Sequence, residues 1–149
     1  MRQPKTWYVI ADGGRARFVE KNAETGAYAT QREFDSAEIH STTRDLGAER
    51  PGRGHESANS AHHAVEPRTD LHQVDKQRFA TEVAVSLNAA GADGAFERLV
   101  LVAPAHAMTD LKAGLDAATT AKVASEVQKD LAKTPNAELA EHFADLRLL

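Results

Sequence analysis

The first 35 residues alternate short apolar runs with turn sequences. The run TWYVIA, residues 6–11, is mostly apolar and is followed by DGG, a sequence typical of a tight turn between antiparallel strands. RARFVEKN (15–22) predicts a second strand and AYATQREF (27–34) a third. Because side chains alternate between the faces of a strand, Tyr28 and Phe34 are expected on one face. The pattern predicts a three-stranded antiparallel meander.

Helical periodicity begins abruptly after this region. Phe79, Val83 and Leu87 recur four residues apart, as they would along the buried stripe of a helix. Asp70 is a candidate cap at the start of this helix, and Gly91 is a natural stop at its end.

The C-terminal third predicts a central strand and two further helices. FERLVLVA, residues 96–103, is almost continuously apolar, as expected of a strand covered on both faces. A short helix follows Pro104, and a last helix is predicted after Pro135. Residues 121–131 carry three apolar positions that fit both a helical and a strand period, so pattern alone leaves this element open.

Residues 36–70 show no sustained period and read as a long mobile loop. A loop of this length inside a domain is typically functional or disordered. The elements around it predict one α/β domain over residues 1–149. Its mixed sheet has about five strands, a meander followed by a β-α-β unit, with flanking helices.

The composition excludes several classes of protein. The chain has 149 residues, 42% hydrophobic and 27% charged, as expected of one globular domain. No run approaches the ~20 apolar residues of a membrane span, and no signal peptide is evident, so we expect a cytoplasmic protein without membrane contact. The absence of cysteine excludes disulfides and thiolate chemistry. A net charge of -4 argues against a DNA-coating protein but permits a local basic patch.

Three separated blocks of sequence resemble the bacterial host-attachment family, proteins required for attachment to host cells. The blocks are WYVIADGGRARFVE, then RPGRGHES followed by HAVEPRTDLHQVDKQRFATEVA, then KDLAKTPNAELAEHFADL. The resemblance covers essentially the whole chain. It implies a fold similar to the middle domain of archaeal and eukaryotic class-one release factors and of pelota, with an RNase H-like core. In that fold, residues 121–131 would form a strand beside 97–103.

The release-factor middle domain carries Gly-Arg-Gly-Gly-Gln-Ser-Ala in its active loop, and the matching frame here is GRGHESA, residues 52–58. His55 replaces a glycine that permits close backbone approach to the substrate. Glu56 replaces the glutamine, and its carboxylate would be repelled by RNA phosphates and by a developing oxyanion. The resemblance therefore implies a loop without peptidyl-tRNA hydrolase activity.

Two alternatives involve catalysis or a metal. A hydrolase could use Glu56 as a general base with His55 or with Asp12, because RNase H-like nucleases hold Mg²⁺ on a first-strand aspartate. The sequence names no second carboxylate for Asp12, and its position favours a turn role. His55, His62 and His63 are candidate zinc ligands, but their spacing matches no structural zinc site, so no cofactor is predicted.

Arginines suggest a different role, because arginine binds phosphate through two parallel hydrogen bonds. The candidate RNA-contacting or partner-contacting residues are Arg15, Arg17, Arg44, Arg50, Arg53, Gly54 and Arg68. Neighbouring acidic residues would equally suit a solvated charged surface. We expect a non-enzymatic binding domain that contacts tRNA, rRNA or the ribosome through residues 44–68. A factor for attachment to host cells and the hydrolase stay open as alternatives.

Overall fold

The computed structural model describes residues 4–36 and 65–146, and of residues 65–72 only the course of the backbone. Several sequence predictions therefore lie outside the described part of the chain. They concern Arg44, Arg50, Arg53, Gly54, His55, Glu56, His62, His63 and the side chain of Arg68.

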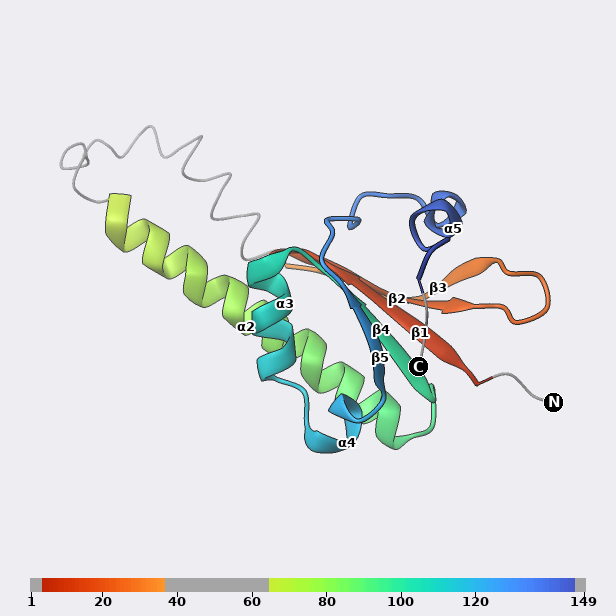
Figure 1. The fold of residues 1–149 in the computed structure, drawn as a ribbon. Helices are drawn as coiled ribbons and strands as arrows, with labels where there is room; N and C mark the ends of the chain where they lie inside the picture. Colours follow the sequence, from red (N-terminus) through yellow and green to blue (C-terminus); the bar gives the residue numbers. More distant parts are fainter. Residues whose placement is uncertain (1–3, 37–64, 147–149) are drawn as a thin grey trace.

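A five-stranded mixed sheet forms the centre of the domain (Figure 1). The strands β1 (Thr6–Ala11), β2 (Arg15–Lys21) and β3 (Tyr28–Asp35) form the predicted antiparallel meander. Next to β1 lies β4 (Arg98–Val102), parallel to it, and β5 (Val123–Val127) is parallel to β4. The order is β3-β2-β1-β4-β5, so the predicted α/β domain with a mixed sheet of five strands is confirmed.

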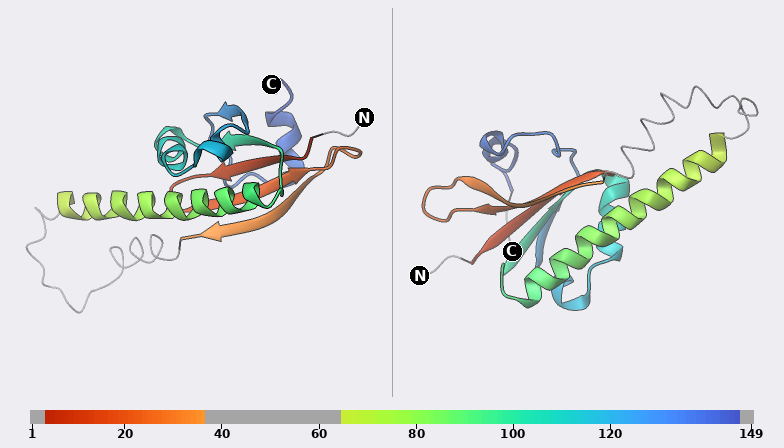
Figure 2. Two further views of the ribbon diagram at one scale, coloured as in Figure 1. Left: turned by 90° about the horizontal axis from the view of Figure 1, so that it is seen from below. Right: turned by 180° about the vertical axis from the view of Figure 1, so that it is seen from behind.

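Helices cover the two faces of this sheet unequally. The long helix α2 (Val65–Ala92) precedes β4, while α3 (Ala105–Ala113) and α4 (Ala117–Thr120) connect β4 to β5. After β5 come a short 3-10 helix, η4 (Asn136–Glu138), and α5 (Leu139–His142). Figure 2 shows α2 and α3 on one face and α5 on the other. No helix in the described ranges is long and apolar enough to span a bilayer.

Alternation along β1 explains why this strand is apolar on both faces. Trp7 and Val9 pack toward α2 and α3, whereas Tyr8 and Ile10 pack toward the C-terminal segment. The core on the α2 side includes Phe79, Val83, Leu87, Leu99, Leu101, Met108 and Leu111. The core on the other side includes Val19, Val100, Val102, Leu131, Leu139 and Phe143.

A bulge in β3 overturns the prediction that Tyr28 and Phe34 share a face. The register passes from Phe18 opposite Arg32 to Val19 opposite Thr30, which leaves Gln31 as an extra residue. An extra residue reverses the facing of every side chain beyond it. Phe34 therefore packs against the core on the α2 side, and Tyr28 against the core on the α5 side.

Both ends of α2 differ from the prediction. The helix begins at Val65, so Asp70 lies inside it and is not a cap, and the predicted loop over 36–70 extends too far. Pro67 is tolerated because the first turn of a helix has no intrahelical partners for its N–H groups. Gly91 lies within the helix, and Gly94, with φ of 80°, ends it. The Ala95 N–H donates to the Ala90 carbonyl at 2.9 Å, closing a Schellman motif.

The structure decides the open element between residues 121 and 131 in favour of a strand. Its register with β4 also shifts, from Leu99 opposite Val123 to Val100 opposite Ser125. The shift turns Val123 and Val127 to opposite faces of the sheet. The predicted last helix is present but reduced to the four residues of α5, although its apolar residues pack against the sheet as expected.

Candidate functional site

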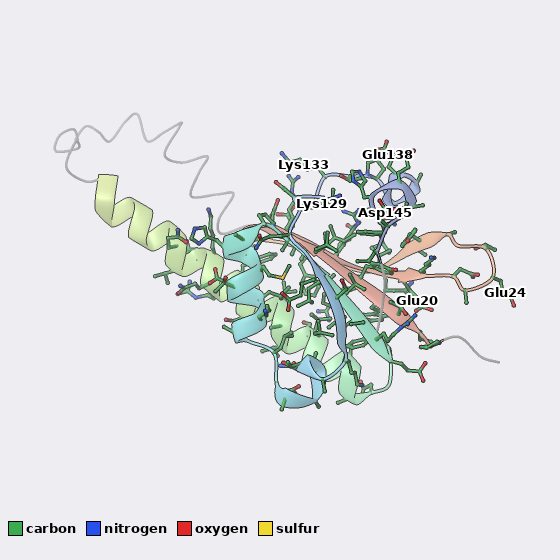
Figure 3. The ribbon with its side chains drawn as sticks, in the orientation of Figure 1. Glu20, Glu24, Lys129, Lys133, Glu138 and Asp145 are labelled. Carbon is green, nitrogen blue, oxygen red and sulfur yellow. The ribbon has the colours of Figure 1, made fainter. Side chains whose placement is uncertain are left out.

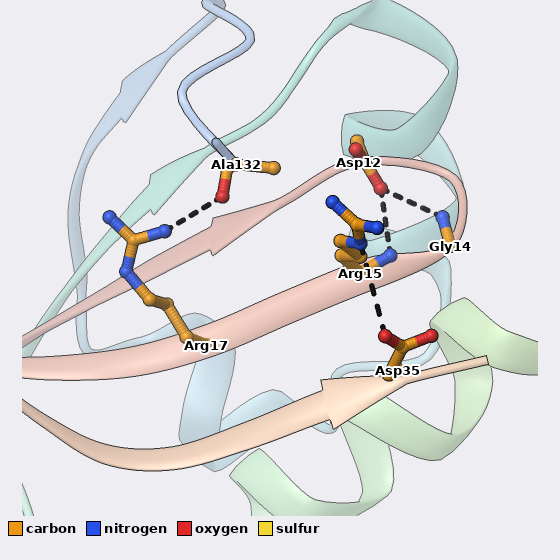
Figure 4. A network of polar contacts seen from close by, with 6 residues as sticks. All are labelled: Asp12, Gly14, Arg15, Arg17, Asp35 and Ala132. Carbon is orange, nitrogen blue, oxygen red and sulfur yellow. Dashed lines mark hydrogen bonds and ion pairs between the residues drawn. The ribbon is translucent and has the colours of Figure 1, made fainter. Parts of the chain in front are cut away.

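Three sequence-predicted site residues, Asp12, Arg15 and Arg17, have described side chains. They lie where β1 turns into β2, at the end of the sheet from which β3 also leaves (Figure 4). The structure brings them together in space but gives them different surroundings.

Asp12 shapes the turn that follows β1. Its Oδ1 accepts hydrogen bonds from the Gly14 N–H at 2.8 Å and from the Arg15 N–H at 2.7 Å. Its own N–H donates to the Arg15 carbonyl at 2.8 Å. Such Asx bonding is a typical use of aspartate in turns, and the predicted turn role is confirmed. The turn needs no left-handed glycine, because among the described glycines only Gly26 and Gly94 have positive φ.

Arg15 extends into solvent from the start of β2. Its Nε lies 3.9 Å from Asp35 Oδ2, and the two side chains are 46% and 63% exposed. An ion pair so long and so exposed contributes little to stability. The guanidinium of Arg15 is therefore available to a partner.

Arg17, two residues along the same strand, is bound within the fold. Its Nη1 donates to the Ala132 carbonyl at 2.9 Å and its Nε to Asn136 Oδ1 at 3.0 Å. Its Nη2 donates to the carbonyl of Thr134. Burial lowers the pKa of Arg17 below its ordinary value, while the carboxylate of Glu33 opposes this shift. Arg17 thus fastens the segment after β5 to the sheet, and its predicted contact with a partner stays a prediction.

A groove runs beside these arginines on the α5 side of the sheet. Its larger hollow, of about 380 Å³, is lined by Ile10, Arg15, Arg17, Glu33, Asp35 and Ala132, among others. A second hollow, of about 310 Å³, shares Arg17, Glu33 and Ala132 with it and continues to Asn136. We call the two hollows the meander groove. Two arginines and two carboxylates line its larger part, so its charges are mixed.

The outer surface next to the groove is also mixed in charge. Figure 3 shows Lys129 and Lys133 on the segment that follows β5, with Glu138 and Asp145 further along the chain. All four side chains are exposed. Neither sign dominates this surface, so it carries no electrostatic footprint of a nucleic-acid site.

A cavity separate from the meander groove, of about 240 Å³, lies at the carboxyl ends of β1 and β4. It is lined by Asp12, Gly13, Lys76, His106 and Asp110, among others. Among the described side chains, those of residues 4–36 and 73–146, no three His, Asp or Glu are grouped so that they could hold a metal ion. The described side chains therefore assemble no metal centre around Asp12.

Sequence reasoning missed the partners of both arginines. Glu33 and Asp35 stand opposite Arg17 and Arg15 in the register of β2 and β3, but the Gln31 bulge hides this pairing from simple alternation. The acceptors of Arg17 lie more than 100 residues further along the chain. No local signal marks such contacts.

A family model described as "Protein required for attachment to host cells" matches residues 7–143. The match runs from the second residue of β1 to the residue that follows α5. No curated protein matches the chain.

Proposed function

The chain belongs to the host-attachment family, and on that premise we propose that it is a non-enzymatic binding domain. One observation carries this proposal: the polar side chains best placed for chemistry are used to build the fold. Asp12 Oδ1 accepts hydrogen bonds from two backbone N–H groups, and Arg17 donates three hydrogen bonds to the segment after β5.

Catalysis requires functional groups that converge on one reacting atom. Asp12 lies beside the cavity at the end of β1, but the described residues supply no grouped carboxylates to share a metal with it. The groups open to solvent, such as Arg15, lie on the rim of a groove with mixed charge. Such a surface suits recognition of a partner better than bond cleavage.

For the partner, we propose RNA, either tRNA or rRNA, or the ribosome, contacted through residues 44–68. Support comes from the arginines of that stretch and from its Gly-Arg-Gly frame. An RNase H-like core related to the release-factor middle domain would place a strand beside β4, and β5 occupies that position. The guanidinium group of arginine can bind a phosphate of single-stranded or folded RNA through two parallel hydrogen bonds.

Co-sedimentation with ribosomes tests this proposal. We expect the wild-type protein to travel with ribosomal particles at low salt, and the double variant Arg50→Ala/Arg53→Ala to stay in the free fraction. The matched control is Arg78→Ala/Lys112→Ala, which removes the same charge from the described surface of α2 and α3. Wild-type protein found only in the free fraction, from both growing and starved cells, would end the RNA proposal.

A second candidate, a role in attachment to host cells, is favoured by the description of the family. A strain without the protein would then adhere less to host cells, and expression of the intact chain would restore adhesion. Fractionation separates a direct role from an indirect one. Protein found mainly on the cell surface would overturn the cytoplasmic prediction, whereas cytosolic protein with an adhesion defect would indicate an indirect role.

The hydrolase alternative would need the carboxylate of Asp12, together with Glu56 or His55, to act on a substrate. The two backbone hydrogen bonds to Oδ1 oppose that use of Asp12. Purified protein that hydrolyses peptidyl-tRNA, and loses this activity on Glu56→Gln substitution, would restore it.

A further inference from the structure

We infer that the C-terminal segment is exchangeable between two copies of the chain, so that it leaves its own sheet and closes on the sheet of a second copy. We call residues 131–146 the C-terminal cover, and residues 128–130, which join it to β5, the hinge. Because the cover supplies one wall of the meander groove, each groove of the exchanged dimer is built from two chains.

The apolar contacts of the cover define the surface that it occupies. Leu131, Leu139 and Phe143 are buried in the core on the α5 side of the sheet. Phe143 also stacks on Tyr8, with 5.0 Å between the ring centroids. The sheet residues of this core are Tyr8, Ile10, Val19, Val100 and Val102. The sheet therefore presents an apolar face that fits residues 131–146, whether they come from the same copy or from another.

The polar contacts between the cover and the sheet are few. The guanidinium of Arg17 donates to the carbonyls of Ala132 and Thr134. The side chain of Asn136 accepts a third bond from Arg17 and donates to Thr30 Oγ1 at 2.8 Å. Within the ranges that the structure describes, no backbone–backbone hydrogen bond joins the cover to the sheet. The cover can therefore separate from the sheet without breaking a strand pair.

The cover has little secondary structure of its own. It contains η4 and α5, of three and four residues. Helices this short are not stable in isolation, because a single turn does not repay the cost of nucleating it. The cover is therefore ordered only while it packs on a sheet, and an open cover closes either on its own sheet or on that of a second copy.

The hinge suits this exchange. Gln128, Lys129 and Asp130 are exposed, and none of them lies in a helix or strand. The Lys129 N–H donates to the Val127 carbonyl at 3.0 Å, which bends the chain directly after β5. Figure 1 shows the chain continuing from there toward α5. Exchange of an identical element costs little once the hinge is extended, because the second copy remakes the same contacts.

The length of the hinge tests the inference through the oligomeric state. A short linker holds the cover at an effective concentration of about 1 mM, so we expect the wild type to be monomeric at micromolar concentration. Deletion of Lys129 and Asp130 keeps the cover from returning to its own sheet, and light scattering should then find a dimer. Insertion of two glycines at the same place is the matched control and should leave a monomer.

A crosslink between β3 and the cover identifies which chain the cover comes from. The chain has no cysteine, so Thr30→Cys/Asn136→Cys introduces its only two thiols, at side chains that touch in the fold. A short bifunctional thiol reagent, added at micromolar protein, joins them within one chain in the monomer and between two chains in the exchanged dimer. On a denaturing gel, we expect covalent dimers from the hinge-deleted chain.

The same crosslink applies to the chain with its full hinge. Protein held at about 1 mM and then diluted should give a substantial fraction of covalent dimers, whereas protein crosslinked before this step should stay monomeric. A folded hinge-deleted chain that remains monomeric, or a dimer whose crosslinks all lie within one chain, would overturn the inference. If the hinge-deleted chain does not fold, as judged by Trp7 fluorescence, the absence of covalent dimers from the full-hinge chain refutes it.

Hydrogen exchange tests whether the cover opens while the sheet stays intact. The amides of Thr134 and Phe143 donate within the cover, to the carbonyls of Leu131 and Leu139. In the wild type, we expect both to exchange at least about tenfold faster than the amide of Leu101 in the central strand β4. Equal protection at all three amides would mean that the cover opens only when the whole domain unfolds, and would contradict the inference. Ribosomes play no part in these measurements, so their outcome neither supports nor weakens the RNA proposal.

Discussion

Replacing Arg17 with alanine should destabilise the fold strongly, whereas the same replacement two residues away should not. Arg17→Ala removes three hydrogen bonds to Ala132, Thr134 and Asn136, which hold the segment after β5 to the sheet. Arg15→Ala removes a 3.9 Å ion pair between exposed side chains. Both substitutions remove one positive charge from one face of β2, so the pair is matched in charge, strand and face.

The magnitude follows from the kind of contact. A hydrogen bond from a charged donor contributes about 1.5–3 kcal/mol, but these bonds share one side chain and border a groove that water can enter. Their loss should therefore cost about 2–3 kcal/mol in total rather than three times the single value. Arg15→Ala should change the free energy of unfolding by less than about 0.5 kcal/mol, as exposed ion pairs usually do.

Urea unfolding, followed by tryptophan fluorescence, measures both values. Trp7 is the one tryptophan of the chain. It is 8% exposed, and its indole N–H donates to Glu20 at 3.1 Å, so its emission should change when the sheet opens. Arg17→Lys should recover only part of the loss, because one ammonium group cannot span three acceptors. An Arg17→Ala variant within 0.5 kcal/mol of wild type, or no more destabilised than Arg15→Ala, would refute the assignment of Arg17 to the fold.

Three further predictions concern packing, titration and register. Gly114→Ala would place a Cβ 2.7 Å from that of Ala84, so we expect about 1–3 kcal/mol of destabilisation by urea unfolding, partly relieved by adding Ala84→Gly. Burial raises the pKa of Tyr8 and of Tyr28 above the ordinary value of 10.0. The stability that the two protonated side chains give the fold is therefore complete below that pH and is lost as the pH rises. In a pH titration, tyrosinate absorbance should appear only together with unfolding. Deletion of Gln31 would remove the extra residue of β3 and keep Tyr28 and Phe34 on opposite faces, so both rings should stay packed and the free energy of urea unfolding should change by less than about 1 kcal/mol.

The pattern of apolar residues and the turn-forming residues predict the strands of this domain well, because the central strands are covered on both faces. TWYVIA is apolar at consecutive positions since β1 supplies residues to both cores. The Asp-Gly sequence marks the first turn because an aspartate can satisfy two backbone N–H groups locally. These features depend on residues close in sequence, and pattern reasoning detects such features.

The two edge strands show where the same reasoning fails. In β3 and in β5, one extra residue shifts the register, so positions that alternate in sequence do not alternate in space. Bulges are common at sheet edges, where they interrupt a row of unpaired backbone groups that would otherwise invite aggregation. The apolar positions at 123 and 127 fit both periods because a spacing of four suits a helix and a regular strand alike, yet the extra residue turns them to opposite faces. Tertiary packing, with one valine on each face, decides the outcome.

The contrast between Arg15 and Arg17 shows why the candidate site was harder to predict than the fold. In the sequence they are equivalent: two arginines at alternate positions of one strand, facing the same way. In space, the segment around Ala132 passes over one and not the other, so one guanidinium is bound within the fold and the other reaches solvent. A contact more than 100 residues apart makes this difference. A partner that recognises this end of the sheet would therefore contact Arg15 first. It would reach Arg17 only by displacing the segment after β5, which covers the core on the α5 side of the sheet.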